Sequence, residues 1–376
     1  MLSEPNQTKL TQKMPILTLE EMMSIVGRSL NRVDASDKVT GKAKYTGDLV
    51  TPNTLVAKVL HSTIANGVVK SFNLDEAWKV AGVVDIVTCF DVPDIAFPTA
   101  GHPWSTVEAY QDIADRKLLN TRVRLYGDDI AAVIAETEIA AQRALKKIEV
   151  TYEEYKPLLT IEEALANTEI PIHDEFPTNI VKSHKYEIGN FEEAIKAPNL
   201  IKVEGEYETP IVKHCHIEPA ISFAYEEAGK IVVVSSTQIP HIVRRVCSQA
   251  LGLPIGKIRI IKPYIGGGFG NRQDALTEPL NAYLTTRVGG RPVKLEYTRE
   301  ETFAFTRVRH AMHFKITSYL NREGDFVARS VKAYSNQGGY ASHAHALVAN
   351  AINAFRMMYP VGAIKGEAYT VYTNLA

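Results

Sequence analysis

The sequence predicts an α+β protein in which a small N-terminal α/β domain precedes a larger mixed α+β region. Two observations support this prediction. Short runs rich in Val, Ile and Tyr recur with alternating polarity, and only a few stretches between them have helical periodicity. The chain also has 376 residues, of which 45% are hydrophobic, which is enough for two or three domains with buried cores.

The first part of the chain divides into a leader and an α/β region. Residues 1–30 form the predicted leader, in which 1–15 are polar and 17–30 fit a short helix with Gly27 near its end. Residues 32–49 are rich in turn-forming side chains, which indicates a surface loop. Within a predicted domain over 31–160, we expect strands at 54–62 and 82–90, a short helix at 75–81, and a strand–helix–strand unit at 131–154.

A second domain is predicted over residues 165–376. Its clearest helix is 239–254, where Pro240 lies in the first turn and Gly252 follows the last apolar residue. Asp274 is expected to cap the next helix, which ends near two glycines at 289–290. The strands expected in this domain are 201–210, 220–227, 230–238, 257–265, 314–320 and 326–336.

Composition argues against several classes of partner. With 42 Lys and Arg against 43 Asp and Glu, the net charge of -1 gives no electrostatic reason to expect nucleic acid or an acidic membrane surface. No segment has the apolar length of a membrane span, and residues 1–15 lack the apolar core of a secretory signal. Cys89, Cys215 and Cys247 are too far apart in sequence for a CxxC metal pair, and three cysteines make no disulfide framework. We therefore expect a cytoplasmic protein that binds neither nucleic acid nor membrane.

The stretch YIGGGFGNRQD (264–274) places four glycines around one phenylalanine, between a predicted strand and a predicted helix. It lacks the lysine and hydroxyl residue of a P-loop, and Asn271 stands where the dinucleotide-binding fingerprint requires glycine. Anion binding by amides at a helix N-terminus stays open, and so does a purely structural turn. Because a loop built only for bending needs no bulky side chain, Phe269 favours a loop whose backbone approaches a bound group.

Five segments together resemble the molybdenum-cofactor subunits of the xanthine dehydrogenase and aldehyde oxidoreductase family. The resemblance runs from about residue 28 to the last residue, with the segments in the family's order, and is strongest to bacterial xanthine dehydrogenase molybdenum subunits that are separate from their FAD and iron–sulfur subunits. The segments are RVDASDKVTGKAKYTGD (32–48), VVSSTQIPH (233–241), IGGGFGNRQD (265–274), REETFAFTRVRHAM (299–312) and YSNQGGYASH (334–343).

The resemblance assigns roles to residues in this sequence. Molybdenum is held there by a pterin dithiolene, so Gln238 and Phe269 would belong to the environment of the metal without coordinating it. Gln238 matches a glutamine that hydrogen-bonds a metal oxo group, and Phe269 and Gly270 match a pair whose backbone approaches the metal, with Gly268 as part of the same approach. Gln273 stands at a substrate position where xanthine oxidoreductases carry glutamate, and Asn350 aligns with an arginine that contacts substrate.

In the same way, the resemblance implies a reaction and its partners. Family members insert water-derived oxygen into an electron-poor C–H bond and pass electrons through iron–sulfur clusters to FAD. We therefore expect molybdenum-molybdopterin on this region, FAD-binding and iron–sulfur partner subunits, and a purine or related small heterocyclic substrate. The general base lies beyond residue 376 in the family's order, so we expect a further polypeptide to carry the C-terminal half of the molybdenum region, and no turnover by this chain alone.

Three alternative functions remain. The chain could be a non-catalytic assembly or remnant subunit, or a family member that acts on aldehydes or nicotinate. An ordinary nucleotide-binding enzyme ranks behind both.

The segment HCHIE (214–218) would place His214, His216 and Glu218 on one face if it were a strand. That arrangement suits zinc in principle, but a hydrogen-bonding scaffold is the preferred interpretation. SHAHA (342–346) is read as a polar loop, and RVRHAMH (307–313) as cations that are solvated or ion-paired.

Overall fold

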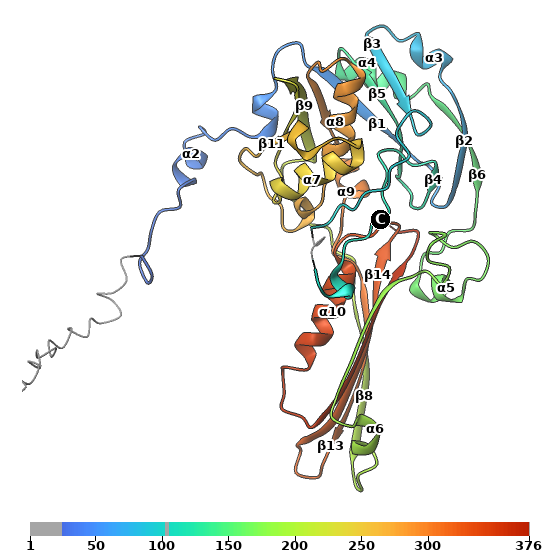
Figure 1. Ribbon diagram of the computed structural model, residues 1–376, viewed down its shortest axis with the longest axis vertical. Coiled ribbons are helices and arrows are strands. Elements are labelled where there is room, and N and C mark those ends of the chain that lie inside the picture. The colour runs from blue at the N-terminus through green and yellow to red at the C-terminus, as the bar shows by residue number, and fades with distance from the viewer. Residues whose placement is uncertain (1–24, 102–104, 376) are drawn as a thin grey trace, which may run out of the picture. The chain divides into compact units, whose positions relative to one another are not determined.

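The computed structural model describes residues 25–101 and 105–375 and divides the chain into two compact units, Met1–Ala43 and Lys44–Ala376 (Figure 1). In the first unit the predicted helix at 17–30 lies mostly outside the described residues. Its described end forms a turn, in which the Arg28 amide donates to the Ile25 carbonyl at 3.2 Å. The loop predicted at 32–49 is wrong in part, because it contains the short helix α2 (Ala35–Val39) and the 3₁₀ helix η1 (Thr46–Leu49).

The strands described in the second unit form three sheets. The largest has the order β11-β10-β9-β12-β1-β5-β3, the next has the order β7-β15-β14-β13-β8, and the smallest is β4-β2-β6. The strands are β1 (Leu55–His61), β2 (Gly67–Asn73), β3 (Val83–Thr88), β4 (Arg122–Val123), β5 (Asp129–Ala135), β6 (Glu149–Glu154), β7 (Ile180–Ile188), β8 (Ile201–Thr209), β9 (Ile221–Glu227), β10 (Lys230–Ser235), β11 (Ile258–Ile261), β12 (Val293–Glu296), β13 (Met312–Leu320), β14 (Phe326–Gly338) and β15 (Ala363–Tyr372).

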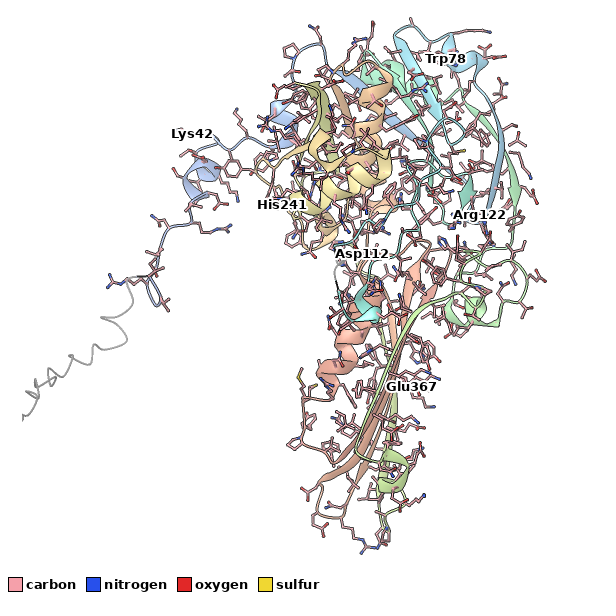
Figure 2. The ribbon with its side chains drawn as sticks, viewed as in Figure 1. Lys42, Trp78, Asp112, Arg122, His241 and Glu367 are labelled. Atoms are coloured by element: carbon pink, nitrogen blue, oxygen red, sulfur yellow. The ribbon has the colours of Figure 1, made fainter. Side chains whose placement is uncertain are left out.

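Helices cover these sheets. The helices of the second unit are α3 (Asp75–Trp78), α4 (Glu138–Leu145), α5 (Ile161–Ala166), α6 (Phe191–Ala194), α7 (Pro240–Leu251), α8 (Glu278–Arg287), α9 (Arg299–Phe305) and α10 (Ala344–Phe355), with the 3₁₀ helices η2 (Glu108–Tyr110), η3 (Ile255–Lys257) and η4 (Asn271–Gln273). Helices α7 and α8 pack against the seven-stranded sheet, and α10 packs along the five-stranded sheet (Figure 1). In Figure 2, His241 marks the first turn of α7 and Glu367 marks β15.

The seven-stranded sheet joins the two predicted domains. Strands β1, β3 and β5 come from residues before 160, whereas β9 to β12 come from residues after 165. The junction is a parallel pairing of β1 with β12, in which Leu55 lies opposite Val293. Strand β5 is buried at all seven positions. Its sequence DIAAVIA is apolar after the first residue, as expected for a strand inside a sheet that is covered on both faces. The boundary at 160–165 stays a prediction.

Most elements agree with the pattern of the sequence, and the exceptions have local causes. Helix α7 begins at Pro240 and is closed by Gly252 at φ 64°, as predicted. Asp274 does not cap α8, since that helix begins four residues later at Glu278 and the Asp274 side chain is used elsewhere. The strands β2, β4, β7, β12 and β15 and the helices α5, α6, α9 and α10 were not predicted. The mixed α+β class is confirmed.

Candidate functional site

The glycine stretch forms a tight loop between β11 and η4. Gly267 has φ 103° and Gly270 has φ 97°, both in the left-handed region that glycine adopts at little cost. Phe269 lies between them at φ 52°, an uncommon angle for an aromatic residue, and its side chain is 74% exposed. The loop therefore exposes the Phe269 side chain. The glycines on either side allow the tight backbone turn that this requires.

The side chain of Gln238 closes one side of this loop. The Gly270 backbone N–H donates to Gln238 Oε1 at 3.1 Å, and the Gln238 backbone N–H donates to the Arg272 carbonyl at 3.0 Å. A Cβ on Gly268 would lie only 2.5 Å from Gln238 Oε1, so a larger residue there would displace the Gln238 side chain. Among the described residues, the Gln238 side-chain NH₂ donates to no protein acceptor. The structure thus brings Gln238, Gly268 and Gly270 together and leaves one amide donor for a bound group.

Arg272 anchors the loop from inside, a role that the sequence analysis missed. Its guanidinium is almost fully buried and donates to the Gly267 carbonyl at 3.0 Å, to the Glu218 and Pro219 carbonyls at 2.8 Å each, and to Ser236. The Glu218 carboxylate lies 3.4 Å from the guanidinium and accepts the Gly266 amide at 2.9 Å. No local pattern could reveal this anchor, because Glu218 lies in the loop before β9 and Arg272 lies in η4, more than fifty residues later.

The HCHIE segment is a hydrogen-bonding scaffold in the structure. Cys215 has φ 55° and breaks the strand on which a shared face depended. His216 is buried between the Asn271 Nδ2, at 2.7 Å from its Nε2, and the Glu218 carbonyl, at 2.6 Å from its Nδ1. The amide donor fixes Nε2 as the acceptor and Nδ1 as the N–H, so the ring is neutral, and burial lowers its pKa accordingly. No group of three or more His, Cys, Asp or Glu in the described part of the chain could hold a metal ion.

A cavity of about 620 Å³ opens beside the loop. Phe269, Gly270 and Gln273 line it, whereas Gln238 and Gly268 do not, so the predicted residues face two sides of one loop. Gln273 is exposed, and its carbonyl lies 3.2 Å from His343 Nε2. The ionisable side chains of the cavity wall are mainly basic; they are Lys213, His214, Asp274, Arg307, Arg309, His310 and His343.

Two of the side chains in the cavity wall are fixed by polar contacts. Asn350 lies on α10 and accepts the Tyr110 hydroxyl at 2.9 Å. Asp274 is buried, accepts the Ser342 hydroxyl at 2.7 Å, and lies 3.7 Å from Arg307. Burial is the largest single effect on the pKa of Asp274 and would raise it, but the charges of Arg307 and His343 and the hydrogen bonds to Ser342 and Thr99 together outweigh burial and lower the pKa. The ionised carboxylate therefore balances part of the positive charge of the cavity wall.

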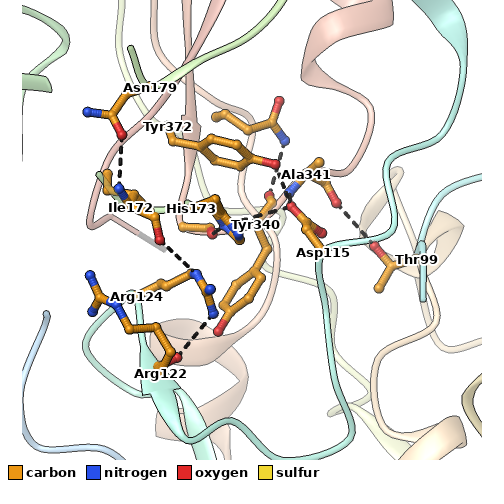
Figure 3. Close-up of polar contacts among 12 residues, drawn as sticks. Thr99, Asp115, Arg122, Arg124, Ile172, His173, Asn179, Tyr340, Ala341 and Tyr372 are labelled. Carbon is orange, nitrogen blue, oxygen red and sulfur yellow. Dashed lines mark hydrogen bonds and ion pairs between the residues drawn. The ribbon is translucent and has the colours of Figure 1, made fainter. Parts of the chain in front are cut away.

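A buried polar network links residues 99–124 to this wall (Figure 3). Arg307 donates to the Thr99 hydroxyl at 2.9 Å, and Asp115 accepts the Ala341 amide at 2.5 Å and the Tyr372 hydroxyl at 2.7 Å. Burial raises the pKa of Asp115 to about 6, because a desolvated carboxylate prefers its proton. Nearby His173 donates from Nε2 to the Gly339 carbonyl at 2.8 Å, and burial lowers its pKa to about 3.

Comparison with known proteins places this geometry among known folds. Residues 172–376 match the family model described as molybdopterin cofactor-binding domain, and residues 40–156 match the a/b hammerhead domain of aldehyde oxidase and xanthine dehydrogenase. The chain is 44% identical to a putative xanthine dehydrogenase molybdenum-binding subunit of Escherichia coli over 345 residues, which are 92% of this chain and 46% of that protein. It thus spans about half the length of this curated relative.

Two further matches are a shorter relative, found by sequence, and a solved structure. The nicotinate dehydrogenase large molybdopterin subunit of Eubacterium barkeri is 32% identical over 93% of this chain, and the match covers 79% of that subunit. The crystal structure of the aldehyde oxidoreductase of Desulfovibrio desulfuricans aligns with a TM-score of 0.85 at 26% identity, over 93% of this chain and 39% of that one.

Proposed function

Because the chain belongs to the molybdenum-cofactor-binding family of the xanthine dehydrogenases and aldehyde oxidases, we propose that it supplies one wall of the molybdopterin site in a hydroxylase that oxidises a purine or related N-heterocycle. The observation that supports this proposal best is the orientation of Gln238. Its amide oxygen is held by the Gly270 N–H, and its NH₂ group is left to donate to a bound group. When bound, the cofactor would supply the redox chemistry that inserts water-derived oxygen into a C–H bond.

The residues present fit such a cofactor. Gly268 leaves no Cβ between the loop and Gln238, and the left-handed angles at Gly267 and Gly270 turn the backbone at the tip of the loop. Arg272 and Glu218 fix this backbone from the buried side, so the donor is positioned before the cofactor arrives. Gln238 would hold and orient the cofactor, and Phe269, exposed at the cavity, would limit the space beside it.

Substrate is proposed to bind in the cavity against Gln273. A neutral amide can pair with a ring nitrogen or carbonyl of a heterocycle, but it adds no negative charge to this basic wall. Nicotinate is the second candidate substrate. The relative of which this chain covers 79% is named a nicotinate dehydrogenase subunit, and a carboxylate would suit the positive side chains of the cavity.

The proposed enzyme is an assembly larger than this chain. The chain spans 46% of the length of its Escherichia coli relative, so we propose that a general base and a second cofactor-binding segment come from the remaining part of the family's length. FAD and iron–sulfur subunits are the proposed electron acceptors. No helix in the described residues is long and apolar enough to cross a membrane.

The test asks whether the Gln238 NH₂ group is needed for activity even when the fold of the loop is kept. Gln238→Glu keeps an oxygen for the Gly270 amide but removes the NH₂ donor, whereas Gln249→Ala changes an exposed glutamine on α7 and serves as control. In protein purified from its native source with its partner chains, we expect the first variant to lower purine or nicotinate oxidation by about tenfold or more. Its thermal unfolding temperature should stay close to that of the wild type.

Molybdenum content measured on the same preparations decides the alternative of a non-catalytic subunit. Stoichiometric molybdenum in the wild type, reduced in the Gln238→Glu variant and unchanged in the Gln249→Ala variant, would support the proposal. A wild-type preparation that contains the partner chains but no molybdenum would overturn it and leave an assembly role.

A further inference from the structure

Strand β8 at the edge of the five-stranded sheet has two contrasting faces. Ile201, Val203 and Tyr207 lie on one face, and their residues are 53%, 55% and 58% exposed. On the other face is a charged row, which consists of Lys202, Glu204, Glu206 and Glu208. Strands with this alternation normally place the apolar face against a core and the charged face in water.

The apolar face of β8 is the same face that α10 covers farther along the sheet. Cross-strand pairing places Tyr207 beside Phe314, and Phe314 beside Ala333, which packs in the core under α10. Helix α10, however, packs on β14, β15 and β7. The β13 and β8 side of this face is left with half-buried and exposed apolar side chains. We call it the β8 strip, and it consists of Ile201, Val203, Tyr207, Met312, Phe314 and Ile316.

The edge of the sheet beside this strip is also unpaired. In the described residues β8 pairs with β13 alone, over nine residues and without a bulge. Its outer backbone donors and acceptors are therefore available to a further strand. Long edges of this kind are usually blocked by prolines, bulges or inward-pointing charges, and β8 has none of these on its apolar face.

The β8 strip is continuous with the cavity of the proposed cofactor site. Ala311, directly before Met312, lines the cavity, and so does Leu347 of α10, which is 48% exposed. The end of the strip at Met312 therefore adjoins the cavity wall that contains Phe269 and Gln273. A partner that covers the Met312 end of the strip would therefore lie next to the cavity wall.

We infer that the β8 strip is the docking surface for the polypeptide that supplies the rest of the family's length, as a separate chain or as a continuation of this one. This inference rests on the proposed function and on the 46% of the Escherichia coli relative that this chain spans. The partner would add a strand to β8, with apolar side chains against Val203 and Tyr207. Basic side chains would alternate with them and meet Glu206 and Glu208 on the other face.

The test uses the full chain in its native host with a photo-crosslinking amino acid in place of Val203. The matched control carries it in place of Ile188, which is 44% exposed at the end of the opposite edge strand, β7, of the same sheet. We expect irradiation to link position 203, but not 188, to sequence that matches the part of the Escherichia coli relative not spanned by this chain. A link to a second copy of this chain, a link to an FAD or iron–sulfur subunit, equal linking from both positions, or no link from 203 would each overturn the inference.

Substitution gives an independent measure. Val203→Asp places a charge on the strip, and we expect it to lower the amount of partner that co-purifies by about tenfold, whereas Ile188→Asp leaves it within about twofold. Molybdenum is measured in the same samples. If molybdenum is present but position 203 forms no link, the docking surface is overturned and the proposed function stands. If position 203 forms the expected link but molybdenum is absent, the proposed function is overturned and the docking surface stands.

Discussion

At the scale of single residues, the site depends on how closely Gln238 approaches the glycine loop. Gly268 gives the side chain of Gln238 its space, and Gly270 gives it a hydrogen-bond donor. These residues could be predicted because they belong to a motif that is contiguous in sequence. His216 and Glu218 were expected as a hydrogen-bonding scaffold, but their partners and the role of Arg272 could not be assigned, because they depend on contacts between segments about fifty residues apart.

A methyl group at position 268 tests this approach. Gly268→Ala would place its Cβ 2.5 Å from Gln238 Oε1, so Gln238 must move, and we expect a loss of about 1–3 kcal/mol in the free energy of unfolding together with lower molybdenum content. Gly256→Ala is the control, because no heavy atom lies within 4 Å of the added carbon. Chemical denaturation and metal analysis measure the two effects. Equal losses in both variants would contradict the steric argument.

At the scale of elements, the loop is positioned by one buried arginine and not by its own hydrogen bonds alone. The Arg272 guanidinium binds carbonyls from the loop and from residues 218–219, so it ties β11 and η4 to the segment that precedes β9. Elements with strong local signals, such as α7 between Pro240 and Gly252, could be predicted. Helix α10 and strand β7 could not, because the apolar α10 begins without a side-chain N-cap and the mixed polar sequence of β7 becomes a strand by pairing with β15.

The anchor is tested by a substitution that keeps its charge. Lysine cannot reproduce the planar set of donors, so Arg272→Lys leaves buried carbonyls without partners, and we expect a loss of about 2–4 kcal/mol in unfolding free energy. Arg259→Lys is the matched control, since Arg259 makes an exposed ion pair with Glu227 at 3.5 Å. Urea denaturation should show little change for the control. A similar loss in both variants would show that Arg272 is not the anchor.

At the scale of the whole second unit, the buried network around Asp115 joins the residues before 125 to the wall of the cavity (Figure 3). Together with the parallel pairing of β1 and β12, it makes the two predicted domains share both a sheet and a polar core. Sequence patterns predicted most of the strands but not this sharing, because periodicity reports local structure and contains no information about which distant strand becomes the neighbour.

The network predicts a pH dependence. The pKa of Asp115 is about 6 in the folded protein against 3.8 for the free side chain, so its contribution to stability is full below about pH 4 and is lost as pH rises to 6. Asp115→Asn removes this loss. Between pH 4 and 7 we expect the variant to gain about 1–3 kcal/mol of unfolding free energy relative to wild type. Denaturation at several pH values measures it.

The exposed Asp94 provides the control for this pH series. Its pKa is lowered by Lys117, the opposite direction from Asp115, so Asp94→Asn should show no gain relative to wild type as pH rises. A flat difference between the Asp115→Asn variant and wild type would contradict the raised pKa.

The pairing of β1 with β12 also has a consequence for synthesis of the chain on the ribosome. Lys58 on β1 donates to the Glu296 carbonyl across 238 residues of sequence. At typical translation rates, roughly 10–50 seconds pass between the emergence of these two segments, and the edge of β1 stays open during that time. The early strands therefore cannot complete their sheet until β12 has emerged, and this high contact order favours slow folding and a need for chaperones while the nascent chain waits for β12.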